Sequence, residues 1–196
     1  MIRGCCKIAV FALLGVLAMV GRSEAGLIPT NVSITPDAGN FRWTYAVVVT
    51  TDVKVNPGDY FTIYDFGGLL PGTAVAPPGW TYSTAKTGPT PTGTNPHDDP
   101  SIDNVTFTYN GGTPINGQAG LGNFMINSTN GDAVSSAFTS VSQTQVGGRT
   151  EANITSTDVP VPGAVPNTTP EPATLAMFGI GLPVLGLLRF LRRRKK

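Results

Sequence analysis

The densest group of polar side chains that could do chemistry is His97, Asp98, Asp99 and Asp103. Carboxylate oxygens on a loop are the ligands that a hard cation such as Ca²⁺ prefers. The spacing lacks the glycine and the ligand pattern of an EF-hand loop, and Asp99-Pro100 is typical of a simple turn. Two interpretations stay open: an ion site at Asp98, Asp99 and Asp103, or a solvated acidic loop without metal.

Aromatic side chains offer a second chemistry, which is stacking on sugar rings. Trp80 directly follows the turn sequence Pro77-Pro78-Gly79, and Tyr82 lies two residues further on. These two residues are the candidates for a sugar contact at the surface. Trp43 lies on the apolar side of an alternating segment and is predicted to be core.

The segment between the two ends of the chain offers little for catalysis. Residues 26–169 contain no cysteine, and their single histidine and single glutamate are His97 and Glu151. Thiol catalysis and multi-histidine zinc sites are therefore excluded. No glycine-rich phosphate loop or cofactor fingerprint appears. We predict a protein that is not an enzyme, with no catalytic residue and no cofactor.

The last 27 residues carry three ordered features. Pro170, Glu171 and Pro172 come first, and an apolar run over 173–188 follows. A helix over 173–191 is long enough to span a membrane. The basic end consists of Arg189, Arg192, Arg193, Arg194, Lys195 and Lys196. The positive-inside rule predicts this end in the cytoplasm and everything before Pro170 on the far side of the membrane.

This order of features resembles the PEP-CTERM sorting signal of bacterial surface proteins. The resemblance implies that an exosortase recognises Pro170-Glu171-Pro172, removes the membrane tail and passes the protein outward. A plain C-terminal anchor is the alternative. The resemblance implies a destination and assigns no activity to residues 26–169.

The other end of the chain predicts export too. Arg3 and Lys7 precede an apolar segment over 8–20, and Ser23 and Ala25 are small residues at the positions that signal peptidase requires. We expect a signal peptide helix within 1–25 and cleavage between Ala25 and Gly26.

The exported segment, residues 26–169, is acidic. Its four cations and ten anions give a net charge of −6. A basic footprint for nucleic acid is absent, and phosphate-rich partners would be repelled.

Turn residues and short alternating segments predict an all-β fold for this part. Phe41–Thr51 is the clearest strand, because Phe41, Trp43, Tyr45, Val47 and Val49 alternate with more polar residues. Further predicted strands are 60–66, 80–83, 105–109, 124–126, 137–146 and 152–155. An antiparallel β-sandwich follows, with a partly open β-barrel as the alternative.

Four parts of the chain are therefore expected. They are the signal peptide at 1–25, the β-sandwich domain at 26–159, a proline-rich linker at 160–169 and the sorting signal at 170–196. We predict an exported, non-catalytic protein of the cell envelope or exopolysaccharide matrix, anchored transiently in the membrane and processed by signal peptidase and an exosortase. A carbohydrate- or calcium-binding surface module is the alternative.

Overall fold

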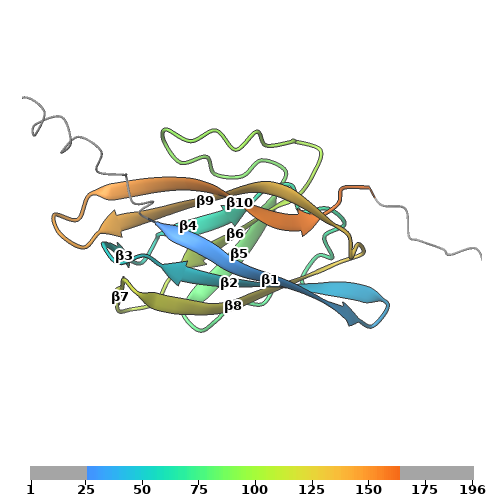
Figure 1. Cartoon of the computed structure of the whole chain (residues 1–196), viewed down its shortest axis with the longest axis horizontal. Helices are drawn as coiled ribbons and strands as arrows, with labels where there is room; N and C mark the ends of the chain where they lie inside the picture. Colours follow the sequence, from blue (N-terminus) through green and yellow to red (C-terminus); the bar gives the residue numbers. More distant parts are fainter. Residues whose placement is uncertain (1–25, 164–196) are drawn as a thin grey trace, which may run out of the picture. The chain divides into compact units, whose positions relative to one another are not determined.

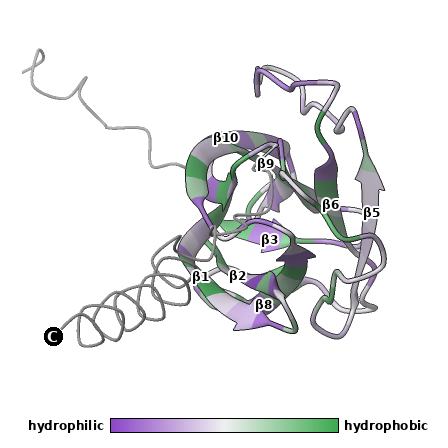
Figure 2. Cartoon of the chain, turned by 90° about the vertical axis from the view of Figure 1, so that its right-hand side faces the viewer, coloured by the Kyte–Doolittle hydropathy of each residue, from purple (hydrophilic) through white to green (hydrophobic). Residues whose placement is uncertain are grey.

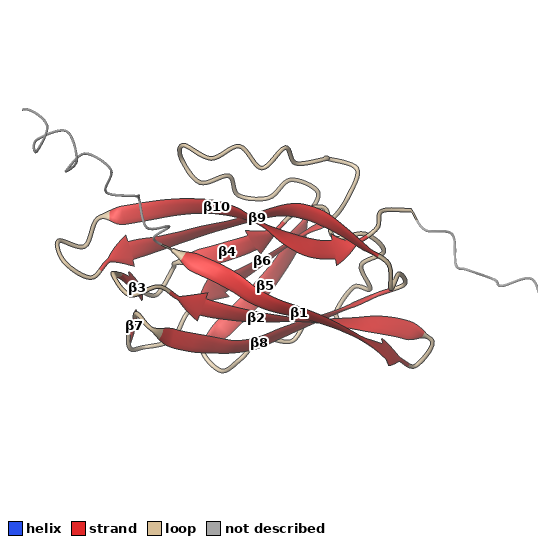
Figure 3. Ribbon diagram, in the orientation of Figure 1, coloured by secondary structure: helices blue, strands red, loops and turns tan. Residues whose placement is uncertain are grey.

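The structure is a computed structural model that describes residues 26–163 of the 196-residue chain. These residues form strands and loops without a helix (Figure 3). The strands are β1 (Leu27–Asp37), β2 (Asn40–Val49), β3 (Val53–Val55), β4 (Tyr60–Ile63), β5 (Trp80–Ala85), β6 (Asn104–Tyr109), β7 (Ile115–Asn116), β8 (Ala119–Ser128), β9 (Ala133–Thr144) and β10 (Thr150–Pro160). The prediction of an all-β antiparallel fold is confirmed. The predicted signal peptide and membrane helix lie outside the described residues.

The strands form two sheets (Figure 1). The smaller sheet has the order β1-β2-β8, and the larger has the order β5-β6-β4-β9-β3-β7. Because β9 pairs with β4 and β3 along one side and with β10 along the other, β10 is an edge strand. Within residues 26–163 no named strand of one sheet pairs with a strand of the other, so the sheets do not close into a barrel.

Strand β2 follows the predicted alternation closely. Trp43, Tyr45, Val47 and Val49 are all buried, and the residues between them are only half-buried. The pattern places one face of β2 on the core, as a period of two residues requires. The prediction placed the strand at 41–51, whereas it begins at Asn40 and ends at Val49.

Strand β1 was not predicted, although it is 11 residues long. Pro29 and Pro36 interrupt its sequence and its side chains are mostly exposed, so no clean alternation marks it. A two-residue turn at Ala38 and Gly39 joins it to β2, and both turn residues have positive φ, 48° and 85°. This conformation matches a type I′ hairpin turn, whose twist suits the flanking strands.

The core is aromatic and joins the two sheets. Phe61 on β4 lies 5.2 Å from Phe107 and 5.1 Å from Phe138 within the larger sheet, measured between ring centroids. Phe124 on β8 of the smaller sheet lies 4.8 Å from Phe61 at a right angle. Edge-to-face and offset pairs of this kind add to the free energy gained by burial. Hydrophobic and hydrophilic residues alternate along β10 (Figure 2).

Candidate functional site

The sorting signals lie outside the part of the chain that the structure describes. This concerns the Pro170-Glu171-Pro172 motif, the basic end from Arg189 to Lys196 and the cleavage position between Ala25 and Gly26. The assignments at these residues stay predictions. Among residues 26–163, no helix has the length and apolar composition needed to cross a bilayer.

The acidic loop between β5 and β6 is held by hydrogen bonds to its own neighbours. One oxygen of Asp98 accepts from the Asn104 side chain at 2.7 Å, and the other accepts from the Gly88 N–H at 3.0 Å. Asp99 accepts from both the N–H and the hydroxyl of Ser101, at 2.9 and 2.7 Å. Each carboxylate therefore has a different set of protein donors.

The third acid and the histidine of this loop lie apart from that network. Asp103 forms a 3.2 Å ion pair with Lys86, while the His97 side chain is exposed. Hydrogen bonds from Ser101 hold the pKa of Asp99 below its usual value. In residues 26–163, no three His, Cys, Asp or Glu side chains are grouped so that they could hold a metal ion. The structural role of the loop acids is thus visible, while an ion at Asp98, Asp99 and Asp103 stays an untested prediction.

Asp65 and Asn104 join this loop to the sheet, and sequence reasoning missed their connection. Asn104 is almost completely buried, and its side-chain oxygen accepts from the Asp65 N–H at 2.8 Å. Asp65 in turn accepts from the Asp99 N–H at 2.9 Å and from the Ser136 hydroxyl at 3.2 Å. A positive φ of 53° at Asp65 turns the chain away from β4. The only sequence signal was an Asn directly before the predicted strand 105–109.

Trp80 lies in the core, and the prediction that it lies at the surface is wrong. Its exposed fraction is 7%, and its ring centroid lies 5.6 Å from Phe61 and 5.2 Å from Phe124. The Pro77-Pro78-Gly79 turn ends at a strand whose first side chain faces inward. Trp80 on β5 lies opposite Tyr109 on β6, and both rings face the same core.

Tyr82 is exposed and borders a shallow groove. Its exposed fraction is 38%, and its ring lies 6.3 Å from the buried Phe107. The groove has a volume of about 810 Å³ and lies between β5 and the segment 72–76. One wall is β5, with Tyr82 and Thr84 on one face of the strand and Thr81 and Ser83 on the other. The other wall consists of small residues and the exposed Val75. An aromatic ring with hydroxyl groups around it can contact a sugar.

Asp59 is the one largely buried carboxylate in the described residues. Burial raises its pKa, and a hydrogen bond from the Asn56 N–H at 2.7 Å opposes the shift. Perturbed carboxylates often mark catalytic sites. This one instead fixes the turn Asn56-Pro57-Gly58-Asp59, because it accepts from the first residue of that turn.

The described residues thus define a domain of antiparallel sheets with no assigned reaction. A family model described as the PEP-CTERM protein-sorting motif matches residues 168–195, which include Pro170-Glu171-Pro172. The chain therefore carries this sorting motif, which indicates an exported protein that is processed by an exosortase after transient anchoring in the membrane. No curated protein sequence matches the chain.

Proposed function

We propose that this protein is a non-catalytic component of the bacterial cell envelope or exopolysaccharide matrix, exported as a β-sandwich domain and released by cleavage near Pro170-Glu171-Pro172. The sorting motif at 168–195 carries the proposal. The acidic and amide side chains of the described domain support it, because Asp59, Asp65, Asp98 and Asn104 are used in turn and loop contacts.

Each part of the chain has a role in this export route. Signal peptidase cleaves between Ala25 and Gly26, and the helix over 173–191 then holds the protein in the membrane with its basic end in the cytoplasm. Two prolines around Glu171 favour an extended backbone, which a protease-like cleft can accept. Glu171 is the centre of recognition, and cleavage frees the domain to the cell surface or matrix.

Replacement of Glu171 tests the proposal. Glu171→Ala keeps the apolar run and the basic end, so we expect normal membrane insertion but no release. Full-length protein should accumulate in the membrane fraction of a host that contains the exosortase, as followed by immunoblotting of membrane and medium. Glu151→Ala is the matched control, because Glu151 is a glutamate at the surface of the domain, in a long 3.6 Å ion pair with Arg149. Release of the Glu171→Ala protein at the rate of the wild type would leave the tail as a plain anchor.

A second candidate function is binding of a neutral polysaccharide in the groove beside Tyr82. The observation that favours it is the exposed ring of Tyr82, with Thr84 on the same face of β5. The net charge of −6 over residues 26–169 disfavours acidic polysaccharides.

Binding of dextran or cellohexaose, with alginate as the acidic comparison, tests the second candidate. Loss of one stacking contact in Tyr82→Ala should weaken binding roughly tenfold. Ile34→Ala is the control, because Ile34 is exposed to the same degree, at 37%, but lies on β1. If neither neutral glycan binds, or if both variants bind like the wild type, the groove is not a sugar site.

A further inference from the structure

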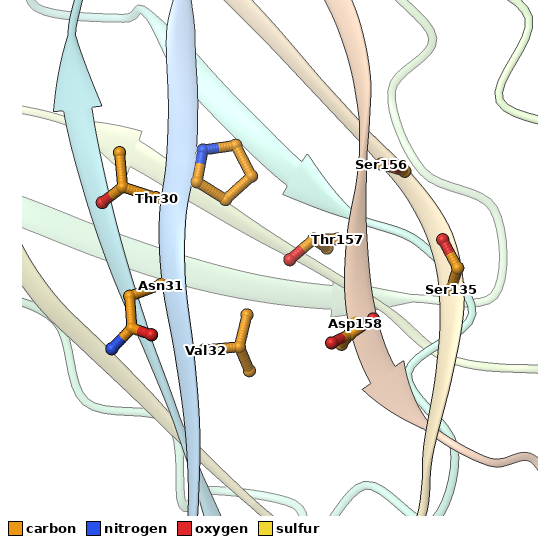
Figure 4. A pocket seen from close by; sticks show the side chains of 8 residues that line it. Thr30, Asn31, Val32, Ser135, Ser156, Thr157 and Asp158 are labelled. Atoms are coloured by element: carbon orange, nitrogen blue, oxygen red, sulfur yellow. The ribbon is translucent and has the colours of Figure 1, made fainter.

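The two sheets are open to one side between the edge strands β1 and β10. At the start of β1 they are joined, because the Leu27 N–H donates to the Ser140 hydroxyl at 3.2 Å and the Leu27 carbonyl accepts from the Asn153 side chain at 3.4 Å. Further along, a β-bulge between Pro29 and Asn31 shifts β1 against β2. At the bulge, a gap of about 340 Å³ lies between residues 29–32 and 156–158 (Figure 4).

Both walls of this gap are strand edges that have no neighbouring strand among the described residues. In an antiparallel ladder, alternate residues direct N–H and C=O away from the partner strand. The Val161 N–H, just after β10, donates to the Asp132 carbonyl, just before β9. Because the direction alternates from residue to residue, Ser156 and Asp158 direct their backbone groups away from β9, toward β1. The Asp158 carbonyl confirms the direction, because it accepts from the Tyr45 hydroxyl at 2.9 Å.

The same alternation applies to β1. The Thr50 N–H donates to the Gly26 carbonyl, so Gly26 directs its backbone groups toward β2. After the bulge, the pairing of β1 with β2 is shifted by one residue. Val32 therefore directs its backbone N–H and C=O away from β2, toward β10. Pro29 lacks an N–H, so an edge position leaves no donor of that residue unpaired. No strand among residues 26–163 pairs with either edge along the gap.

The β10 wall of the gap contains a hydroxyl group without a hydrogen-bond partner. Thr157 is 6% exposed, and its Oγ1 has no hydrogen-bond partner within the described residues. Figure 4 shows Thr157 and Val32 pointing toward each other from the two walls. A buried hydroxyl without a partner costs free energy, and this one lies where the two walls face each other.

We propose that the gap binds an extended polypeptide strand of a partner protein, inserted between β1 and β10. Both strands run in the same direction (Figure 1). Leu27, at the start of β1, contacts Asn153. Further along β1, Val32 pairs with Tyr45, whose hydroxyl donates to Asp158. One strand antiparallel to both would extend both sheets and join them. Strand spacings give about 160 Å³ per inserted residue, so the gap holds about two residues between its walls.

The side chains around the gap define the chemistry of the partner strand. A small residue, such as serine or alanine, fits between Thr157 and Val32. Asp158 is the only charged residue that lines the gap. A lysine or arginine beside it on the outer face complements this charge. A second copy of the chain is a poorer partner, because two domains that each carry a net charge of −6 repel one another.

A synthetic peptide can serve as the probe for the full-length protein. It alternates threonine and valine over roughly nine residues, with a serine and a lysine at the centre. We expect saturable binding and slower amide hydrogen exchange at Ser156 and Asp158, but not along the other open edge at β5. The same peptide with N-methylated backbone amides should not bind, because recognition uses main-chain hydrogen bonds.

Two variants at Ser156 separate backbone from side-chain recognition. Ser156→Pro removes an N–H that points into the gap without touching the β9 ladder, so binding should weaken roughly fivefold or more. Ser156→Ala keeps the N–H and should bind like the wild type. Asp158→Asn should weaken binding and reduce its dependence on salt.

Three outcomes would overturn the proposal. They are equal binding by Ser156→Pro with an unchanged circular dichroism spectrum, equal binding of the N-methylated peptide, and protection of β5 amides in place of β10 amides. An absence of any peptide binding would also reject it and leave water as the occupant of the gap.

Discussion

At the scale of single residues, the polar side chains of this domain mainly hold loops in place. Asn104 shows the principle, because its side chain donates to Asp98 and accepts from the Asp65 N–H. Its burial makes both bonds hard to replace by water. These two bonds fix the long loop between β5 and β6 to the larger sheet.

Asn104→Ala should lower the free energy of unfolding by about 1–3 kcal/mol, since it leaves the Asp65 N–H without its acceptor and removes one of the two donors to Asp98. Urea denaturation measures this change. Asn110→Ala is the control, because Asn110 bonds Thr81 at the exposed end of the same strand pair and should cost much less. A calcium titration of the wild type belongs to this experiment: a clear rise in unfolding temperature would show that the folded domain binds calcium.

At the scale of elements, one carboxylate adds a side-chain contact between the β1–β2 hairpin and β8, beside the backbone pairing of β2 with β8. Asp37, the last residue of β1, accepts from the Asn127 side chain at 2.9 Å and from Arg42 at 2.7 Å. The hydrogen bond from Asn127, followed by that from Arg42, lowers the pKa of Asp37 below 3.8. The ionised form is therefore the one that both side-chain hydrogen bonds favour.

The sign of the pH dependence follows from this lowered pKa. The contribution of Asp37 to stability is fully present above its ordinary pKa of 3.8 and is lost as the pH falls through the lower value in the folded protein. Asp37→Asn should remove this loss, so wild type and variant should converge in stability toward acid. Urea midpoints measured from about pH 6 to about pH 2 check the prediction. The exposed Asp52→Asn serves as control, and a constant difference between Asp37→Asn and wild type at every pH would contradict it.

At the scale of the whole molecule, one aromatic core carries the described domain. It joins both sheets through Phe61, Phe107 and Phe124, and it contains no disulfide because residues 26–169 have no cysteine. A chain of this length can bury enough apolar surface to fold as one unit. The edges beside β10 and beside β5 are places where a partner could add to the fold.

The purified segment 26–169 should therefore fold alone. We expect a β-type circular dichroism spectrum and one cooperative thermal transition in the presence of a chelator, because the core needs neither metal nor membrane tail. Calorimetry and circular dichroism at several wavelengths measure this. A disordered spectrum that becomes ordered only after calcium is added would transfer the stabilising role to the acidic loop.

Local patterns in the sequence predicted the all-β class, the inward face of β2 and the sorting motif. Alternation along one strand determines which side chains face the core, and the order of Pro-Glu-Pro, apolar run and basic end is itself linear. Neither property depends on distant residues. The family match at 168–195 accordingly agrees with what could be read from the sequence.

Only the tertiary structure decided the neighbours of Trp80, the role of the loop acids and the edges of the sheets. Trp80 is buried because β6 and β8 bring Tyr109 and Phe124 to it, and their register is not encoded beside Trp80. Asp98 and Asp99 are adjacent in sequence but bond different residues once the loop folds onto Asn104 and Asp65. Strand β1 exists through its hairpin pairing with β2, which outweighs its two prolines. Pairing and register arise between segments far apart in the chain, so the sequence alone could not supply them.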